Sequence, residues 1–335
     1  MKIFINKKNI KNIVKFVFII SVVIYLSTLI SAKDMIDLFG NLSIIYVFFA
    51  VLVCLFDKIL MGLKWNILLS IFDKKVTYFS CVVSYLKAKV LHLFTPSSIG
   101  EDLYKIYYMN KNNIYLPGIV SSIVIERSLG AISSLGLISL FLHFSVKYLR
   151  EEYLYQATVL GFFLFFSIVF FIYFLIFYSE NLKKISFGKI LPPRLNDKFI
   201  RLLAAMALIG EHRKRIWLYF VFSVFEKMLY GTAIFLSAAA LGLDNISYMY
   251  IVAAAPLLAL LERLPISLAA FGVRESLIVV LLSPFSITTT SAVSVALVLR
   301  LAEIIVSILC SILWLVDRQD KNLESEIRKI EGTLA

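Results

Sequence analysis

The sequence is poor in the residues that build disulfide frameworks, metal sites and nucleophile–base pairs. Its 335 residues include only three cysteines and three histidines. All six lie singly along the chain: Cys54, Cys81, Cys310, His92, His143 and His212. Their spacing fits neither paired disulfides nor a zinc ligand set. We therefore predict no metal, no cofactor and no catalytic triad.

Charge is also scarce, since 17% of the residues are charged and 60% are hydrophobic. This balance is typical of a polytopic membrane protein. Crossing about 30 Å of hydrocarbon takes roughly 20 apolar residues. Six runs are long enough, at residues 13–31, 42–60, 116–142, 154–178, 216–241 and 289–316. The first is longer than a signal-peptide core and lacks a cleavage pattern, so we expect a retained helix. The predicted fold is an all-α membrane protein with six full crossings.

Two further apolar stretches, residues 76–96 and 248–264, run into proline and glycine and then into charge. Proline removes a backbone donor and glycine relaxes the backbone, so a helix can break there. We predict re-entrant hairpins over residues 76–110 and 248–285. The break positions are Pro96, Gly100, Pro265 and Gly272. Non-helical backbone at membrane depth must be buried in protein or line a wet cavity, so a polar interior is expected.

The distribution of lysine and arginine predicts the orientation, because cationic loops stay on the cytoplasmic side. With both termini in the cytoplasm, the outside loops contain only Lys33, Lys147 and Arg150. The basic loop 179–215 would lie against anionic headgroups of the cell membrane. The net charge of +12 lies in short loops between spans, so the membrane explains it and no nucleic acid is expected.

The two broken segments resemble each other. TPSSIGEDLYK is followed by Arg127, and LPISLAAFGVRE is followed by Arg300. Asp102 to Arg127 and Glu275 to Arg300 are both spaced by 25 residues. If the two segments enter the membrane from opposite sides, each half has the same order of helix, crossing, hairpin and crossing. This order indicates two inverted repeats, a transporter architecture. We assign the first repeat to residues 1–150, the second to 151–318, and a charged cytoplasmic tail to 319–335.

Ionisable residues at membrane depth are expected to pair, because an isolated charge there costs at least about 2.5–3.5 kcal/mol on insertion scales. Glu226 and Lys227 suit a purely structural pair. The two arginines in equivalent places instead predict a pocket whose guanidinium groups bind an oxyanion, a lipid phosphate or a carboxylate. The candidate substrate-binding residues are Arg127, Arg274, Arg300, Lys105, Asp102, Glu126, Glu275 and Glu303.

Over residues 10–318 the pattern resembles the membrane region of lysylphosphatidylglycerol synthases, a flippase-like family. Glu-Arg at 126–127 and Gly-Val-Arg-Glu at 272–275 are its most specific matches. Lys105 stands where the family often has arginine, and Ala269 to Phe271 replace a glycine-rich tip. The resemblance implies translocation of a phospholipid or lipid-linked intermediate between leaflets, with membrane lipids of anionic or phosphate headgroup as partners, and an association with lipid- or glycan-synthesis enzymes.

Two other functions remain open. Full-length synthases transfer an aminoacyl group through a soluble domain, but only residues 317–335 follow the last crossing here, so a translocator is expected rather than an enzyme. Sugar or phosphoryl transfer from a polyprenyl carrier could use Asp102, Glu126 or Glu275 as base. A non-transporting adaptor could instead recruit a partner through the basic loop. A phospholipid, a polyprenyl phosphate and a lipid-linked saccharide would all fit the predicted cavity.

Overall fold

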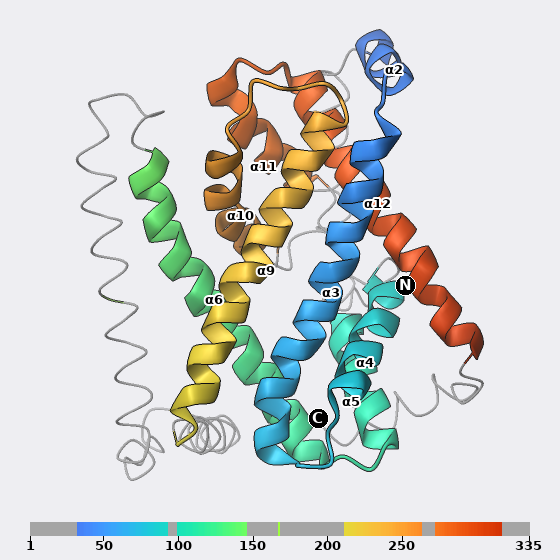
Figure 1. Cartoon of the computed structure of the whole chain (residues 1–335), viewed down its shortest axis with the longest axis vertical. Helices are drawn as coiled ribbons and strands as arrows, with labels where there is room; N and C mark the ends of the chain where they lie inside the picture. The colour runs from blue at the N-terminus through green and yellow to red at the C-terminus, as the bar shows by residue number, and fades with distance from the viewer. Residues whose placement is uncertain (1–31, 93–98, 146–166, 168–210, 263–271, 317–335) are drawn as a thin grey trace, which may run out of the picture. The chain divides into compact units, whose positions relative to one another are not determined.

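The structure is a computed structural model that describes residues 32–92, 99–145, 167, 211–262 and 272–316 (Figure 1). Within these ranges all regular structure is helical, which confirms the predicted fold class. The elements are α2 (Ala32–Gly40), α3 (Ile44–Phe72), α4 (Tyr78–His92), α5 (Ile99–Lys111), α6 (Leu116–Ser145), α9 (Arg213–Ala239), α10 (Tyr248–Glu262), α11 (Val273–Leu282), the short 3-10 helix η3 (Ser283–Phe285) and α12 (Thr289–Val316).

Four of the described helices, α3, α6, α9 and α12, are long and apolar enough to cross a membrane. They match the predicted crossings at 42–60, 116–142, 216–241 and 289–316, whereas those at 13–31 and 154–178 lie outside the described residues. At roughly 1.5 Å per residue, the 29 residues of α3 span about 44 Å, more than the hydrocarbon layer.

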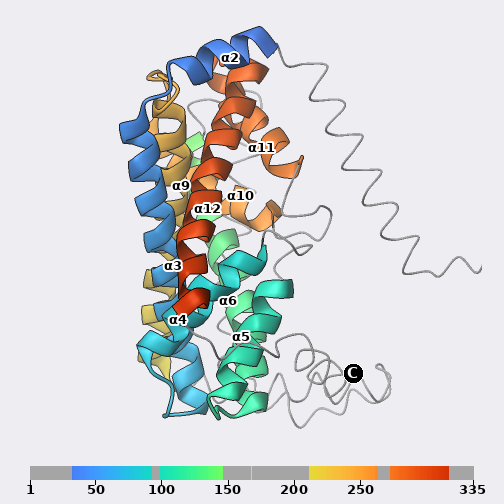
Figure 2. The ribbon, with the colours of Figure 1, turned by 90° about the vertical axis from the view of Figure 1, so that its right-hand side faces the viewer.

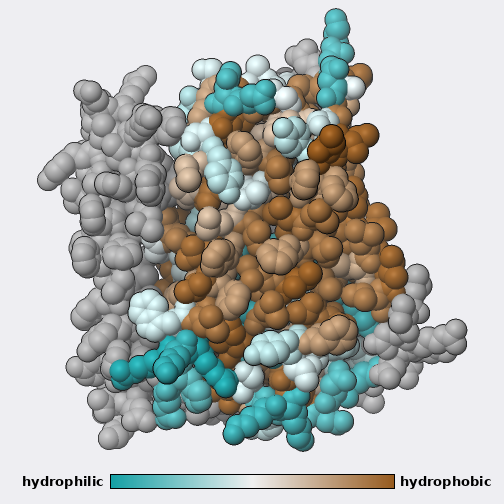
Figure 3. Space-filling view, viewed as in Figure 1, coloured by the Kyte–Doolittle hydropathy of each residue, from teal (hydrophilic) through white to brown (hydrophobic). Residues whose placement is uncertain are grey.

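Large apolar side chains on α3 and α9 are exposed, as expected for helices in contact with lipid. Phe48 and Phe56 on α3 are more than half exposed, and so are Trp217 and Phe225 on α9. Figure 3 shows mainly hydrophobic side chains where these two helices face the viewer. In water such a surface would be an aggregation hazard, so it fits the membrane environment that the composition predicts.

Hydroxyl side chains begin three of the helices. Thr77 Oγ1 accepts the amide of Ser80 at the start of α4, at 3.2 Å. Thr288 does the same for Ser291 at the start of α12, also at 3.2 Å. Ser247 plays this part for α10, more weakly at 3.5 Å. Each satisfies an amide that has no partner inside its helix, so the sequence itself specifies these starts.

Both predicted breaks lie between two described helices. Residues 93–98 separate α4 from α5, and residues 263–271 separate α10 from α11; Pro96 and Pro265 lie in these gaps, outside the described residues. Gly100 is in the first turn of α5. Gly272 directly precedes α11 with φ 81°, a conformation that favours glycine. The re-entrant path of each hairpin stays a prediction.

The chain forms two compact units. Unit 1 consists of residues 1–57, 86–104 and 228–335, and unit 2 of residues 58–85 and 105–227. In unit 1, α11 packs against α10 and α12, and α2 packs against α12 (Figure 2). In unit 2, Leu68 of α3, Ile125 of α6 and Tyr219 of α9 belong to one apolar core. The predicted division at residue 150 stays a prediction.

The chain passes from one unit to the other within a repeated stretch of sequence. FDKILMG at 56–62 in α3 corresponds to FEKMLYG at 225–231 in α9, and the unit boundaries fall after Asp57 and after Lys227. The final glycine of each stretch packs on the next helix. A Cβ on Gly62 would lie 2.6 Å from Cα of Val82 in α4, and one on Gly231 would lie 2.6 Å from Cα of Val252 in α10. The same contact thus fixes α3 to α4 and α9 to α10, while the inverted arrangement of the predicted repeats stays a prediction.

Gly62→Ala and Gly231→Ala should each lower the unfolding temperature of the protein in detergent. The new methyl would meet backbone atoms of Val82 or Val252, which cannot rotate away. Gly136→Ala in α6 is the matched control, because no atom lies within 4 Å of its added Cβ. Alanine is a better helix former than glycine by about 1 kcal/mol, so the control should be neutral or slightly stabilised. Equal thermal shifts for all three variants would contradict the close packing.

Candidate functional site

A buried arginine of unit 1 is held by carboxylates from two other helices. Arg274 lies in the first turn of α11 and is 4% exposed. Its Nε donates to Glu262 Oε1 at 2.9 Å and its Nη2 to Glu262 Oε2 at 3.1 Å, a bidentate pair. Its Nη1 donates to Glu303 Oε2 at 2.8 Å. Glu262 is the last residue of α10 and Glu303 lies in α12, so one guanidinium joins three helices.

The same network continues to further polar groups of unit 1. Tyr230 donates its hydroxyl proton to Glu262, and Lys89 Nζ lies 3.8 Å from Glu303 Oε1. Together with Arg274 and its two carboxylates, these residues are called the arginine network below. They come from α4, α9, α10, α11 and α12.

A second ion pair fixes the start of α11. Arg300 Nη2 donates to Glu275 Oε1 at 2.9 Å, and both side chains are buried. The other oxygen of Glu275 accepts the amide of Gly272 at 2.6 Å. A carboxylate at the third position of a helix that accepts the N-cap amide is half of a capping box. Arg300 therefore holds the residue that orders the helix on which Arg274 stands.

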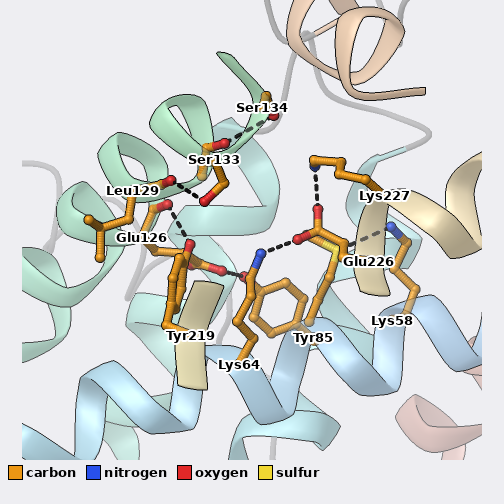
Figure 4. A network of polar contacts seen from close by, with 12 residues as sticks. Lys58, Lys64, Tyr85, Glu126, Leu129, Ser133, Ser134, Tyr219, Glu226 and Lys227 are labelled. Carbon is orange, nitrogen blue, oxygen red and sulfur yellow. Dashed lines mark hydrogen bonds and ion pairs between the residues drawn. The ribbon is translucent and has the colours of Figure 1, made fainter. Parts of the chain in front are cut away.

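Unit 2 contains a buried network of its own, built on lysine. Figure 4 shows the carboxylate of Glu226 between the ammonium groups of Lys64 and Lys227. Lys64 donates to Oε2 and Lys227 donates to Oε1 at 2.7 Å. All three side chains are at most 5% exposed. The glutamate thus joins α3 to α9.

A second buried glutamate of unit 2 binds the third lysine. Lys105 Nζ lies 3.3 Å from Glu126 Oε2 and donates to Tyr85 Oη at 3.0 Å, while Tyr85 donates its own proton to Glu126 Oε1. Tyr219 donates to the backbone carbonyl of Glu126 at 2.9 Å. Aromatic rings lie beneath the cations: Lys64 is 5.0 Å from the ring centre of Tyr219, and Lys105 is 4.3 Å from that of Tyr85. Such rings attract a desolvated cation.

The predicted site residues are divided between these clusters. Arg274, Arg300, Glu275 and Glu303 meet in unit 1, where each of the two carboxylates binds an arginine. Lys105 and Glu126 meet in unit 2. The predicted pair of Glu226 and Lys227 is present, but it also includes Lys64. Since the candidates belong to two units, the single chamber expected from the sequence stays a prediction.

The prediction that Arg127 is buried is wrong. Its side chain is exposed, whereas its neighbour Glu126 is 7% exposed. Successive residues of a helix point about 100° apart, and here Glu126 faces the core of unit 2 while Arg127 points away from it. Asp102 is half-buried in the first turn of α5, where a negative charge is favoured by the helix dipole.

Sequence reasoning missed Lys64, Tyr85 and Tyr230 as members of these networks. The repeated FDKILMG and FEKMLYG stretches were the available signal, because they place an acid, a lysine and a packed glycine at equivalent positions of two crossing helices. Tyr230 lies inside the second stretch, and Lys64 follows the first by two residues. Tyr85, on α4, has no comparable signal.

Chemically, both networks present cations in a low-dielectric interior, where buried carboxylates bind them; Lys227 and its carboxylate Glu226 share α9, and the other pairs join two helices. Such an arrangement can accept an oxyanion if a carboxylate gives up its place on a cation. No such exchange is possible for a single isolated pair without leaving a charge bare. The arginine network has two carboxylates on one guanidinium, and the network of unit 2 has two ammonium groups, Lys64 and Lys227, on the carboxylate of Glu226.

Comparison with known proteins gives one clear relationship. A search of curated proteins and a search of solved structures found no match. The family model described as the lysylphosphatidylglycerol synthase TM region matches residues 12–311, which is most of the chain. The chain therefore belongs to the family of the lysylphosphatidylglycerol synthase membrane region, and it is a membrane protein of lipid-related function.

Proposed function

We propose that the protein translocates a lipid between the two leaflets of the membrane, binding its anionic or phosphate headgroup through buried cations. Family membership supports a lipid as the ligand. Ionisable side chains inside a membrane protein mark the pathways of polar ligands, since their burial is costly without a function or a partner. The acyl or isoprenoid chains would stay in hydrocarbon while the headgroup passes through the protein.

The observation that carries this proposal is the sharing of Arg274 between Glu262 and Glu303. A phosphate oxygen that replaces one carboxylate leaves the guanidinium paired at every stage, so no bare charge is created. Tyr230 and Lys89 keep the displaced carboxylate in contact with a donor. Arg274 thus binds the headgroup in this mechanism, and Arg300 acts on it indirectly, by holding Glu275 and the start of α11.

The test is leaflet exchange in liposomes of phosphatidylcholine that contain the purified protein and a headgroup-labelled phosphatidylglycerol. Exchange is measured as the fraction of label that becomes accessible to a quenching reagent that cannot cross the membrane. We expect exchange well above that of protein-free liposomes, and a fall of about tenfold or more in Arg300→Ala, because α11 loses its anchor. Lys183→Ala with Lys184→Ala, in the basic loop, should change exchange little.

Two results would contradict the proposal. One is exchange no faster than in protein-free liposomes. The other is the appearance of a lipid of new mass, which would support the enzyme that the sequence left open. If only the loop variant lost function, the adaptor would be the better assignment.

A further inference from the structure

We propose that the lysine network of unit 2 is a second oxyanion site, which takes the phosphate of a lipid headgroup. The site consists of Lys64, Lys105 and Lys227 with their two glutamates. It deepens the proposed function and rests on it for the identity of the ligand as a lipid. The arginine network belongs to unit 1 and shares no residue with it.

The charge composition of the network favours an anionic ligand. In the described part of unit 2, the buried charged residues are Lys64, Lys105, Lys227, Glu126 and Glu226. Among these the ammonium groups outnumber the carboxylates by one. Because Glu226 is shared by Lys64 and Lys227, an occupant with one negative charge that binds one of them leaves each ammonium group with an anionic partner. A phosphodiester headgroup has that charge.

The aromatic rings of the network stabilise the ammonium groups without adding negative charge. Lys64 lies over Tyr219, and Lys105 lies over both Tyr85 and Trp65, at 4.3–5.1 Å from the ring centres. A ring face stabilises a desolvated ammonium but cannot neutralise it. The rings thus stabilise the ammonium groups beside the glutamates that already bind them, and they leave the net charge of the network unchanged.

A hydroxyl group beside the network adds a donor that has no partner of its own. Ser223 Oγ is fully buried and makes no hydrogen bond in the described structure. It lies three and four residues before Glu226 and Lys227 on α9, so all three share one face of the helix. A buried hydroxyl without a partner is costly, and a phosphate oxygen would supply the missing acceptor.

The geometry suits phosphate better than carboxylate. The donors come from α3, α5 and α9, and a tetrahedral phosphate offers oxygens in several directions whereas a carboxylate offers two in one plane. Lysine binds phosphate as a point charge and does not require the planar match that arginine makes with a carboxylate.

The test is direct binding by the full chain in a maltoside detergent, which contains no phosphate. The probe is dioctanoylphosphatidylglycerol, and dioctanoylglycerol is the probe without phosphate. We expect Lys64→Met to weaken binding of the phosphate lipid about tenfold, as for one charge-assisted hydrogen bond, with Lys64→Arg close to wild type. Lys111→Met, the same change on the same unit outside the network, should have no effect.

Lys64→Met should fold, because Glu226 keeps its contact with Lys227. Ser223→Ala is a second variant that removes no charge. It should weaken binding of the phosphate lipid a few-fold and leave binding of dioctanoylglycerol unchanged. Three results would contradict the site: binding like wild type by both Lys64→Met and Ser223→Ala, binding by Lys111→Met as weak as by Lys64→Met, or binding of dioctanoylglycerol as tight as that of the phosphate lipid.

Leaflet exchange separates this inference from the proposed function. Lipid exchange by the wild type together with unchanged lipid binding by Lys64→Met would contradict the second oxyanion site and support the proposed function. Lipid binding that depends on Lys64, in a protein that shows no leaflet exchange, would support the second oxyanion site and contradict lipid translocation.

Discussion

Arg274→Ala should reduce leaflet exchange to the rate of protein-free liposomes and lower the free energy of unfolding by about 3–5 kcal/mol. The guanidinium binds Glu262 and Glu303, whose side chains are only 12% and 16% exposed. Without it, two carboxylates in a low-dielectric interior lose their main counter-charge. The unfolding temperature in detergent measures the structural loss, and the liposome assay measures the functional one.

Two further variants separate structure from function at this position. Arg274→Met combined with Glu262→Gln removes one charge of each sign, while Glu303 keeps its contact with Lys89. This double variant should regain most of the lost stability and none of the exchange. Arg274→Lys keeps the charge but loses the bidentate contact, so an intermediate exchange rate is expected. Normal stability of Arg274→Ala, or restored exchange in the double variant, would contradict the role given to the arginine.

The sequence was sufficient for the features that depend on hydrophobicity alone. The four described crossings agree with their predicted ranges because a membrane span needs about 20 apolar residues, whatever it packs against. Thr77 and Thr288 begin α4 and α12 by a local hydrogen bond, which does not depend on hydrophobicity and was not part of the predicted ranges. In each case the determining interaction lies within a few residues of the chain.

Where the burial of a side chain depends on what packs against its helix, the sequence alone could not predict it. Glu126 and Arg127 are equally polar neighbours, yet Glu126 faces Lys105 and Arg127 is exposed, because the packing of α6 decides which of them is inside. Lys64 sits in an apolar run without an acid beside it, and its partner Glu226 is 162 residues away. The acid–lysine pairs at equivalent positions of the two repeated stretches, Asp57-Lys58 and Glu226-Lys227, were the local indication that this part of each helix is polar.

Glu226→Gln should be the most destabilising single change in unit 2, by about 3–5 kcal/mol in the free energy of unfolding. The substitution keeps the shape of the side chain but removes the carboxylate that contacts both Lys64 and Lys227. Two ammonium groups less than 5% exposed would then face a neutral amide, and α3 and α9 would lose the ionic contact that joins them. Chemical or thermal unfolding in detergent measures the effect, and Glu211→Gln at an exposed position is the matched control.

Charge balance, rather than a single contact, should account for this loss. Glu226→Gln with Lys64→Met leaves one buried ammonium fewer and should recover part of the stability. Adding Lys227→Met makes all three positions neutral and should bring the protein close to wild type, since a buried ion network can be replaced by apolar groups of similar volume at little cost. Glu226→Asp keeps the charge, as Asp57 does in the equivalent stretch, and should lose less than Glu226→Gln. If Glu226→Gln unfolded like Glu211→Gln, or if the triple variant were less stable than the single one, the lysines would not depend on this carboxylate.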